Sequence, residues 1–224
     1  MSDKRTRHLR IVGLMVAGLV LLGFAGISVW QGLVSAKADV DTLRARWLVS
    51  QWRANTGPVF SPALWHQTTS DLRAGLELTP DNAQLLDDMG FLYAGRAIGL
   101  GTPEVNSEAY AQQQTLFTNA IESYRAATLV RPTFPYTWAY LAQTKELKGE
   151  IDLELWKAFD TAMRYGRNEP GVQLSIARVA FAHWETLDAD RKKQILSMID
   201  EARPGPRKDL YDVGEGYGVV LLNM

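Results

Sequence analysis

The sequence predicts an all-α protein, with one membrane-spanning helix at the N-terminus followed by a helical domain. Three observations predict this class. An uncharged apolar run extends from Ile11 to Trp30. Downstream, apolar residues recur at helical spacing between Pro, Gly and capping residues. The alternating runs of β-branched residues that are typical of strands are missing from the sequence.

The apolar run 11–30 is long enough to cross a membrane as one helix. At about 1.5 Å per residue it spans roughly the 30 Å hydrocarbon core of a bilayer, and it has no polar stripe. The positive-inside rule predicts a cytoplasmic tail (residues 1–10), a single pass through a bacterial inner membrane and a periplasmic C-terminal domain. The basic residues that predict this orientation are Lys4, Arg5, Arg7 and Arg10.

A cleaved signal peptide is the competing interpretation of this run. Ala36-Lys37-Ala38 has the small-x-small form of a cleavage site, with cleavage after Ala38. The run is longer than the apolar region of a signal peptide, which favours an uncleaved anchor. Gly18, Ala25 and Gly32 recur every seventh residue. Such small residues allow close approach of membrane helices, although they are also common in membrane helices generally.

The composition excludes several classes of function. Lys plus Arg number 24 and Asp plus Glu 25, so the near-zero net charge gives no basis for nucleic-acid binding. The absence of Cys excludes disulfides, thiol catalysis and cysteine metal sites. Packing alone must therefore stabilise the exported domain.

Residues 31–60 are predicted to form a juxtamembrane helix and a linker. The helix is expected over 39–54 and ends before Thr56-Gly57-Pro58. Its apolar face, at helical spacing, is expected to dock on the domain. That face comprises Val40, Leu43, Trp47, Leu48 and Trp52.

Residues 61–203 are predicted to form a helical domain, which brings the total after the anchor to eight or nine helices. Ser61, Asp81 or Asn82, and Asp188 are the expected N-caps, and Gly149 is an expected stop. Pro204-Gly205-Pro206 is expected to end the last helix. Residues 204–224 are then a tail, in which Gly214, Gly216 and Gly218 form a flexible element.

Three similar boundaries suggest an internal repeat, because Pro80, Pro132 and Pro170 each separate two predicted helices. Small and bulky residues stand around them at regular positions: Met89, Gly90, Tyr93, Ala120, Tyr124, Ala127, Trp138, Leu141 and Ala142. Over about residues 61–187 the chain is similar to the tetratricopeptide repeat family in degenerate form. The excess length at 99–114 implies an inserted loop or a longer helix. An ordinary helical bundle would share some of these marks.

Several segments carry a narrower resemblance: 72–82, 89–93, 131–139 and 169–174. Together with the single N-terminal membrane helix, they resemble VpsP-type proteins found with bacterial exopolysaccharide biosynthesis and export systems. The resemblance implies an accessory role in polysaccharide assembly. It brings no catalytic signature.

The residues that carry chemistry do not form a recognisable active site, so we expect no enzyme, no metal and no cofactor. His66 and His183 lack the spacing of zinc ligands; His66 is expected on a helix surface and His183 as a hydrogen-bonded core residue. Asp87 and Asp88 are adjacent, point about 100° apart on a helix and are expected to be a solvated pair.

The remaining candidate for a functional site is a surface, namely the concave face that stacked helix pairs form. Aromatic rings among amides and carboxylates there would bind an extended peptide or a sugar, unless some of them pack as core. The residues are Gln84, Asp87, Phe91, Tyr136, Gln143, Glu146, Phe181, Trp184 and Glu185.

The sequence thus predicts a non-enzymatic, membrane-anchored periplasmic interaction module with protein partners in the cell envelope, belonging to polysaccharide machinery. The alternative is a chaperone or assembly factor of a secretion or cytochrome-maturation system, and a more remote one is an enzyme with an unrecognised site.

Overall fold

A computed structural model describes the backbone of residues 2–219 and 221, and their side chains from Met15 onward apart from Ala17. The described chain is all-helical and contains no strand. The basic tail residues that predict the orientation lie outside the described side chains. The helices are α1 (Ser2–Arg53), α2 (Pro62–Leu78), α3 (Ala83–Ile98), α4 (Glu108–Val130), α5 (Pro135–Lys148), α6 (Leu153–Gly166), α7 (Pro170–Ala182), α8 (Ala189–Glu201) and α9 (Pro204–Gly216).

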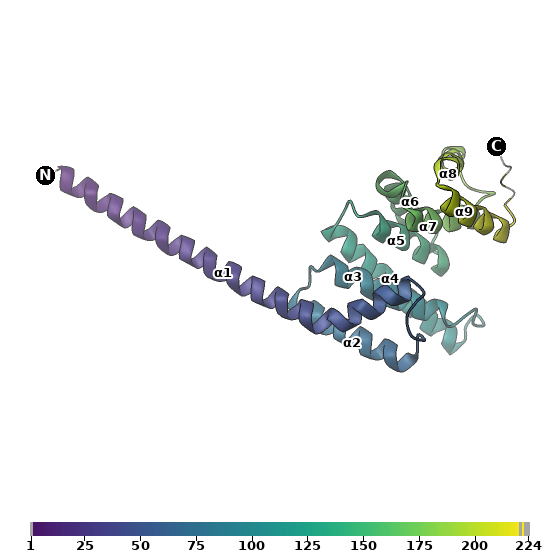
Figure 1. Ribbon diagram of the computed structural model, residues 1–224, viewed down its shortest axis with the longest axis horizontal. Coiled ribbons are helices and arrows are strands. Elements are labelled where there is room, and N and C mark those ends of the chain that lie inside the picture. The colour runs from purple at the N-terminus through teal and green to yellow at the C-terminus, as the bar shows by residue number, and fades with distance from the viewer. Residues whose placement is uncertain (1, 220, 222–224) are drawn as a thin grey trace.

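Helix α1 is one continuous helix of 52 residues, whose N-terminal part projects from the domain and whose C-terminal end lies against it (Figure 1). The expected separate helix over 39–54 is therefore the C-terminal end of the same helix that contains the apolar run. The physical reason lies in residues 31–38, which contain no Pro. Their one Gly, Gly32, costs only about 1 kcal/mol in a helix interior, which does not interrupt it.

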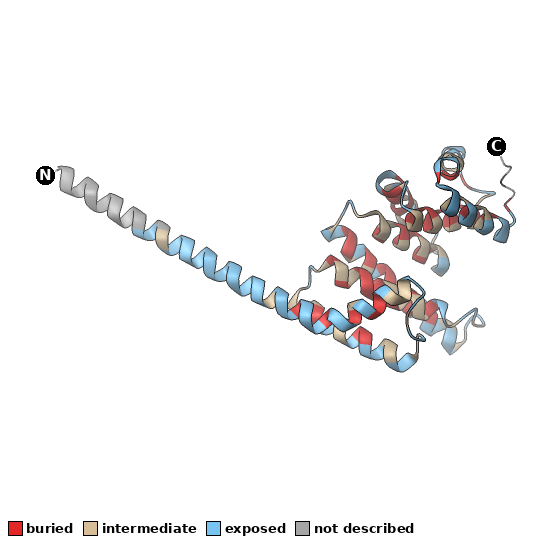
Figure 2. Cartoon of the chain, viewed as in Figure 1, coloured by how far each residue is buried: buried red, intermediate tan, exposed pale blue. Residues whose placement is uncertain are grey.

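The projecting part of α1 exposes its apolar side chains, as the pale blue rod in Figure 2 shows. By length and composition, α1 is the one helix of the described chain that is able to cross a membrane. None of its most apolar stretch is buried in the protein.

The docked end of α1 confirms two of the five residues of the expected face, because Leu48 is buried and Trp52 packs against the core, but the other three are exposed. Val40, Leu43 and Trp47 are 73%, 66% and 56% exposed. The buried face instead carries small residues, which let α1 lie close to α2 and α3: Ala38, Thr42, Ala45, Leu48 and Val49. Gly75 on α2 explains the choice, because a Cβ there would overlap the Thr42 side chain.

The remaining helices pack as successive neighbours, and α7 also packs against α5 and α9 (Figure 1). The predicted starts of three helices are confirmed, because side chains cap them there. Ser61, Asn82 and Asp188 accept backbone N–H bonds from the first turns of α2, α3 and α8. Gly149 ends α5 with φ of 84°, in the left-handed region that favours glycine.

The excess length between Pro80 and Pro132 is divided between two features. Residues 99–107 form the α3–α4 connection, and α4 is long, with 23 residues. Gln113 holds this connection in place, because its amide donates to the carbonyl oxygens of Ala97 and Gly101 at 3.0 and 2.8 Å.

The predicted C-terminal tail is wrong in its first part. Pro204-Gly205-Pro206 begins α9, with Pro204 in the first turn. Leu210, Gly214 and Val219 are buried, and Gly214 lies against Phe181 of α7 and Leu221. Residues 204–219 therefore close the end of the core that α7 and α8 leave open. Pro at the first helical position is favourable, because its missing N–H is one that the helix does not use.

Close packing of α3 on α4 depends on Gly90. A Cβ at position 90 would lie 2.6–2.8 Å from carbon atoms of the buried Tyr124 ring. Gly95, on the same helix, would meet only Phe60, at an ordinary 3.7 Å.

We expect Gly90→Ala to destabilise the full chain by about 1–3 kcal/mol, because α4 must move away from α3. Gly95→Ala is the matched control and should be neutral or stabilising by up to about 1 kcal/mol, because Ala favours helix. Urea unfolding in detergent micelles measures both. Equal stabilities for the two variants would contradict the close-packing role of Gly90.

Candidate functional site

The last residue of α1, Arg53, meets two carboxylates of α3. Its Nη2 lies 2.9 Å from Asp87 Oδ2 and 3.1 Å from Asp88 Oδ1, and it also donates to the Asp87 carbonyl oxygen at 3.1 Å. Both carboxylate residues are only 2% exposed. The guanidinium therefore joins the C-terminal end of α1 to α3.

Helix α5 completes the cluster. Thr137 Oγ1 donates to Asp87 Oδ1 at 2.7 Å, so that each oxygen of Asp87 has a partner. Gln84 Nε2 donates to Asp88 Oδ1 at 2.9 Å. We call Arg53, Asp87, Asp88 and Thr137 the Arg53 cluster.

Aromatic rings surround the guanidinium of Arg53. Its carbon Cζ lies 4.8 Å from the Phe91 ring centre and 5.5 Å from that of Tyr140. A cation over an aromatic face is attracted by the ring quadrupole, more strongly where water is excluded. The rings therefore help to hold the buried positive charge.

The cluster shifts the acidities of its members. Burial raises the pKa of Asp88 to about 6, although the Arg53 charge acts in the opposite direction. For Arg53, burial opposes the charge, but Asp87 and Asp88 attract it and leave its pKa raised. Asp88 is thus a carboxyl group that changes charge near pH 6.

The expectation that Asp87 and Asp88 are a solvated pair is wrong. Their side chains do leave the helix in different directions, yet one long guanidinium reaches both. Local spacing missed this because Arg53 lies 34 residues before Asp87. Arg53 was not predicted as a site residue, and nothing near it in the sequence marks it as one.

Two hollows flank Arg53, on either side of its guanidinium. We call them the near hollow and the far hollow. The near hollow measures about 240 Å³ and lies between α1, α3 and α5. The far hollow measures about 350 Å³ and extends across α3 and α5 to α7. Arg53 lines both hollows, so we treat the two neighbouring hollows as one candidate site, the Arg53 groove.

Five of the predicted groove residues line the Arg53 groove. Gln84, Asp87 and Tyr136 line the near hollow, and Phe91 and Gln143 line the far one. The sequence therefore indicated the contributions of α3 and α5.

Three predicted groove residues at the C-terminal end of α7 and just beyond it do not line either hollow: Phe181, Trp184 and Glu185. Phe181 is buried core and packs against Trp184, with ring centres 5.6 Å apart, and Glu185 is exposed beyond the helix end. Helix α7 contributes residues nearer its N-terminus, all on one helical face: Gly171, Leu174, Ser175 and Arg178.

Glu146 lies outside both hollows too, beside His183. His183 Nε2 is 3.9 Å from Glu146 Oε1 and has no hydrogen-bond partner, although burial shields it. The ring is half-buried and lies at the end of α7, so the expected hydrogen-bonded core histidine is wrong. Burial raises the pKa of Glu146. His66 is on the surface of α2, as predicted.

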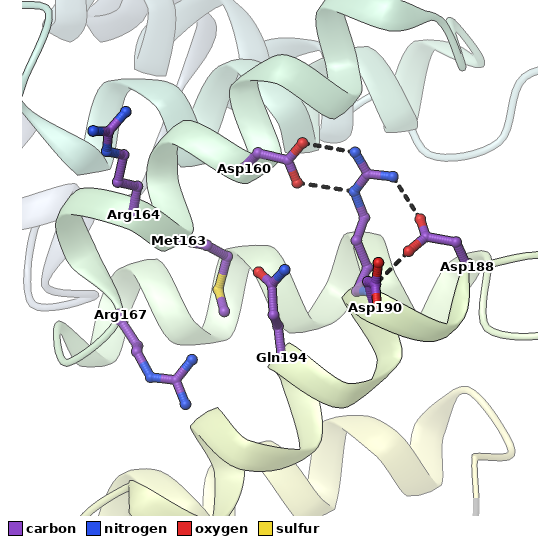
Figure 3. A pocket seen from close by; sticks show the side chains of 8 residues that line it. Asp160, Met163, Arg164, Arg167, Asp188, Asp190 and Gln194 are labelled. Carbon is purple, nitrogen blue, oxygen red and sulfur yellow. Dashed lines mark hydrogen bonds and ion pairs between the residues drawn. The ribbon is translucent and has the colours of Figure 1, made fainter.

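A separate hollow of about 440 Å³ lies between α6 and α8 (Figure 3). Asp160 and Asp188 both bind Arg191, at 2.6 and 2.5 Å. Arg191 also lies over the Trp156 ring, at 4.9 Å. These charges neutralise one another, so we assign the hollow a structural role. Among the described side chains, no group of three His, Asp or Glu residues is arranged to hold a metal.

Comparison with known proteins assigns the chain to no family. No protein-family model matches the chain, and no curated protein matches it either.

Replacing Arg53 by Met should destabilise the full chain by about 3–5 kcal/mol, because two buried carboxylates lose their counter-charge. Arg46→Met is the matched control: Arg46 pairs with the exposed Asp39 at 3.0 Å on the same helix. That loss should stay below about 1 kcal/mol. Chemical unfolding measures both, and adding Asp87→Asn and Asp88→Asn to Arg53→Met should recover part of the loss. Equal losses of stability in the two Arg variants would exclude a stabilising role for the contact of Arg53 with Asp87 and Asp88.

Stability should also depend on pH through Asp88. Its pKa of about 6 in the folded state exceeds the unfolded value of about 3.9, so the folded state holds the proton more tightly. The free energy of unfolding should therefore fall as pH rises from 4 to 6, by about 3 kcal/mol from this group, and level off above. Asp88→Asn should remove that decrease. Parallel pH profiles for the variant and the unchanged chain would disprove the assignment.

Proposed function

We propose that this protein is a non-enzymatic, membrane-anchored module whose Arg53 groove binds an extended segment of another envelope protein. The observation that carries the proposal is that two neighbouring hollows, both lined by Arg53, together border α3, α5 and α7. Two neighbouring hollows suit an extended chain, which can place a side chain in each, better than a compact small molecule.

The dimensions and the chemistry of the hollows support a peptide ligand. Volumes of about 240 and 350 Å³ suit a few side chains each. In an extended peptide, side chains on one side are about 7 Å apart, so neighbouring hollows can take alternate residues. The walls of the far hollow combine apolar and polar groups: Phe91, Leu147, Leu174, Gln143, Ser175 and Arg178.

The position of the anchor supports a site that faces the membrane surface. Trp30, at the end of the apolar run, shares a hollow with the α2–α3 corner, residues 78–82. Interfacial Trp residues lie at headgroup depth. We propose that the N-terminus is cytoplasmic and the domain periplasmic, in a bacterial inner membrane, because of the basic residues before the run.

The architecture also supports a degenerate tetratricopeptide-like array. Successive helices pack as pairs, and Gly90 on α3 faces Tyr124 on α4 where a small residue permits close crossing. Arrays of this kind bind partners along the face formed by alternate helices. The assignment to exopolysaccharide machinery rests on the sequence resemblance to VpsP-type proteins.

Photo-crosslinking in native membranes tests the proposal. A photoreactive amino acid at Tyr136 or Gln143 should yield the same discrete partner, and Arg178→Glu should weaken the product at position 143. Lys157, exposed on α6 away from the groove, is the control position and should not yield it.

Mass spectrometry of the product distinguishes the possible clients. A polysaccharide-assembly protein would support the proposed role, whereas a translocation or haem-ligation protein would replace it. The same product at Lys157 would overturn the groove as the binding site.

A further inference from the structure

Helix α1 carries an exposed apolar seam with a period of seven residues. Leu33, Val40 and Trp47 recur every seventh residue, and Ala36 and Leu43 stand three residues after the first two. These are the first and fourth positions of a heptad repeat, the pattern of two-stranded coiled coils. Leu33 is 62% exposed, and Ala36, Val40, Leu43 and Trp47 are exposed as well.

The domain occupies the opposite side of the same helix. Buried residues Ala38, Thr42, Ala45 and Val49 stand at the third and sixth heptad positions, which lie away from the seam. Docking of α1 on α2 and α3 therefore leaves the seam free. A second helix is able to lie along it without displacing the domain.

The charges beside the seam complement one another across a parallel pair. Asp39 stands at the last position of one heptad and Arg44 at the fifth position of the next. In parallel coiled coils, these positions of opposite chains face each other. Arg44 is exposed and has no ion-pair partner among the described side chains, whereas Asp39 already contacts Arg46 of its own chain.

The same register continues into the apolar run. Leu19, Leu22, Gly26 and Val29 occupy the seam positions there, and all of them are exposed. Gly18 and Gly32 lie along its edge, and a Cβ at either position would meet nothing of its own chain within 4 Å. Because both helices would leave the same side of one membrane, a pair must be parallel.

We infer that α1 associates with α1 of a second copy of this chain as a parallel two-stranded coiled coil along the Leu33–Trp47 seam. The seam residues Leu33, Ala36, Val40, Leu43 and Trp47 line neither hollow of the Arg53 groove, so the inference rests on the proposed membrane anchoring but not on the proposed ligand. Its occupant is the identical chain because the seam is self-complementary in both apolar period and charge.

Disulfide trapping tests the seam, and the Cys-free sequence makes it specific. Single Cys substitutions at Ala36, Val40 and Leu43 should crosslink full-length protein in membranes. The exposed off-seam positions Ser35 and Asp41 are the controls. Because disulfides need Cα atoms about 4–7 Å apart, seam positions should oxidise at least about tenfold faster. Equal rates at all five positions, or no dimer, would overturn the inference.

A charge exchange tests the pairing between copies. Arg44→Asp places like charges opposite Asp39 of the other chain and should reduce the dimer fraction in detergent, measured by light scattering. Adding Asp39→Arg should restore it. Arg44 is exposed, so its replacement leaves the core unchanged, and circular dichroism checks helicity. An unchanged dimer fraction in Arg44→Asp, or no recovery in the double variant, would exclude this pairing.

Discussion

The contact of Arg53 with Asp87 and Asp88 joins the two parts of this protein. It lies at the C-terminal end of α1, and it is the point where α1, α3 and α5 meet through charged and hydroxyl groups. A guanidinium suits this position, because its planar array of donors reaches several acceptors at once. The same side chain forms the wall shared by the two hollows, so the packing of the anchor and the shape of the groove depend on one residue.

Helix α1 has one face that packs against the domain and an opposite face that is exposed. Small residues on one side allow α2 to come close, with Gly75 against Thr42. Large apolar residues on the other side remain exposed. Because α1 is one continuous helix, the proposed membrane span and the docked end belong to the same element. In the proposed dimer, two grooves would face the same membrane surface.

Much of the fold is readable from local sequence, and much of the candidate site is not. Capping residues such as Asn82 and Asp188 act on backbone groups two or three residues away, so they identify helix starts directly. The face on which a helix docks depends on its partner. Val40 and Trp47 have the hydrophobicity of core residues, yet they are exposed and Thr42 is buried, because Thr42 lies against Gly75 of α2. The expected tail also depends on a distant partner. Its residues Pro204–Gly216 form α9, which packs against Phe181 of α7.

The sequence by itself determined the all-helical class, the apolar length of the anchor, most helix boundaries and the contributions of α3 and α5 to the groove. These follow from periodicity and from interactions within one or two helical turns. Only the tertiary structure decided which face of α1 is buried, that Asp87 and Asp88 converge on Arg53, and which end of α7 borders the groove. Those features depend on distances between residues more than 30 positions apart, where the crossing of helices sets the register.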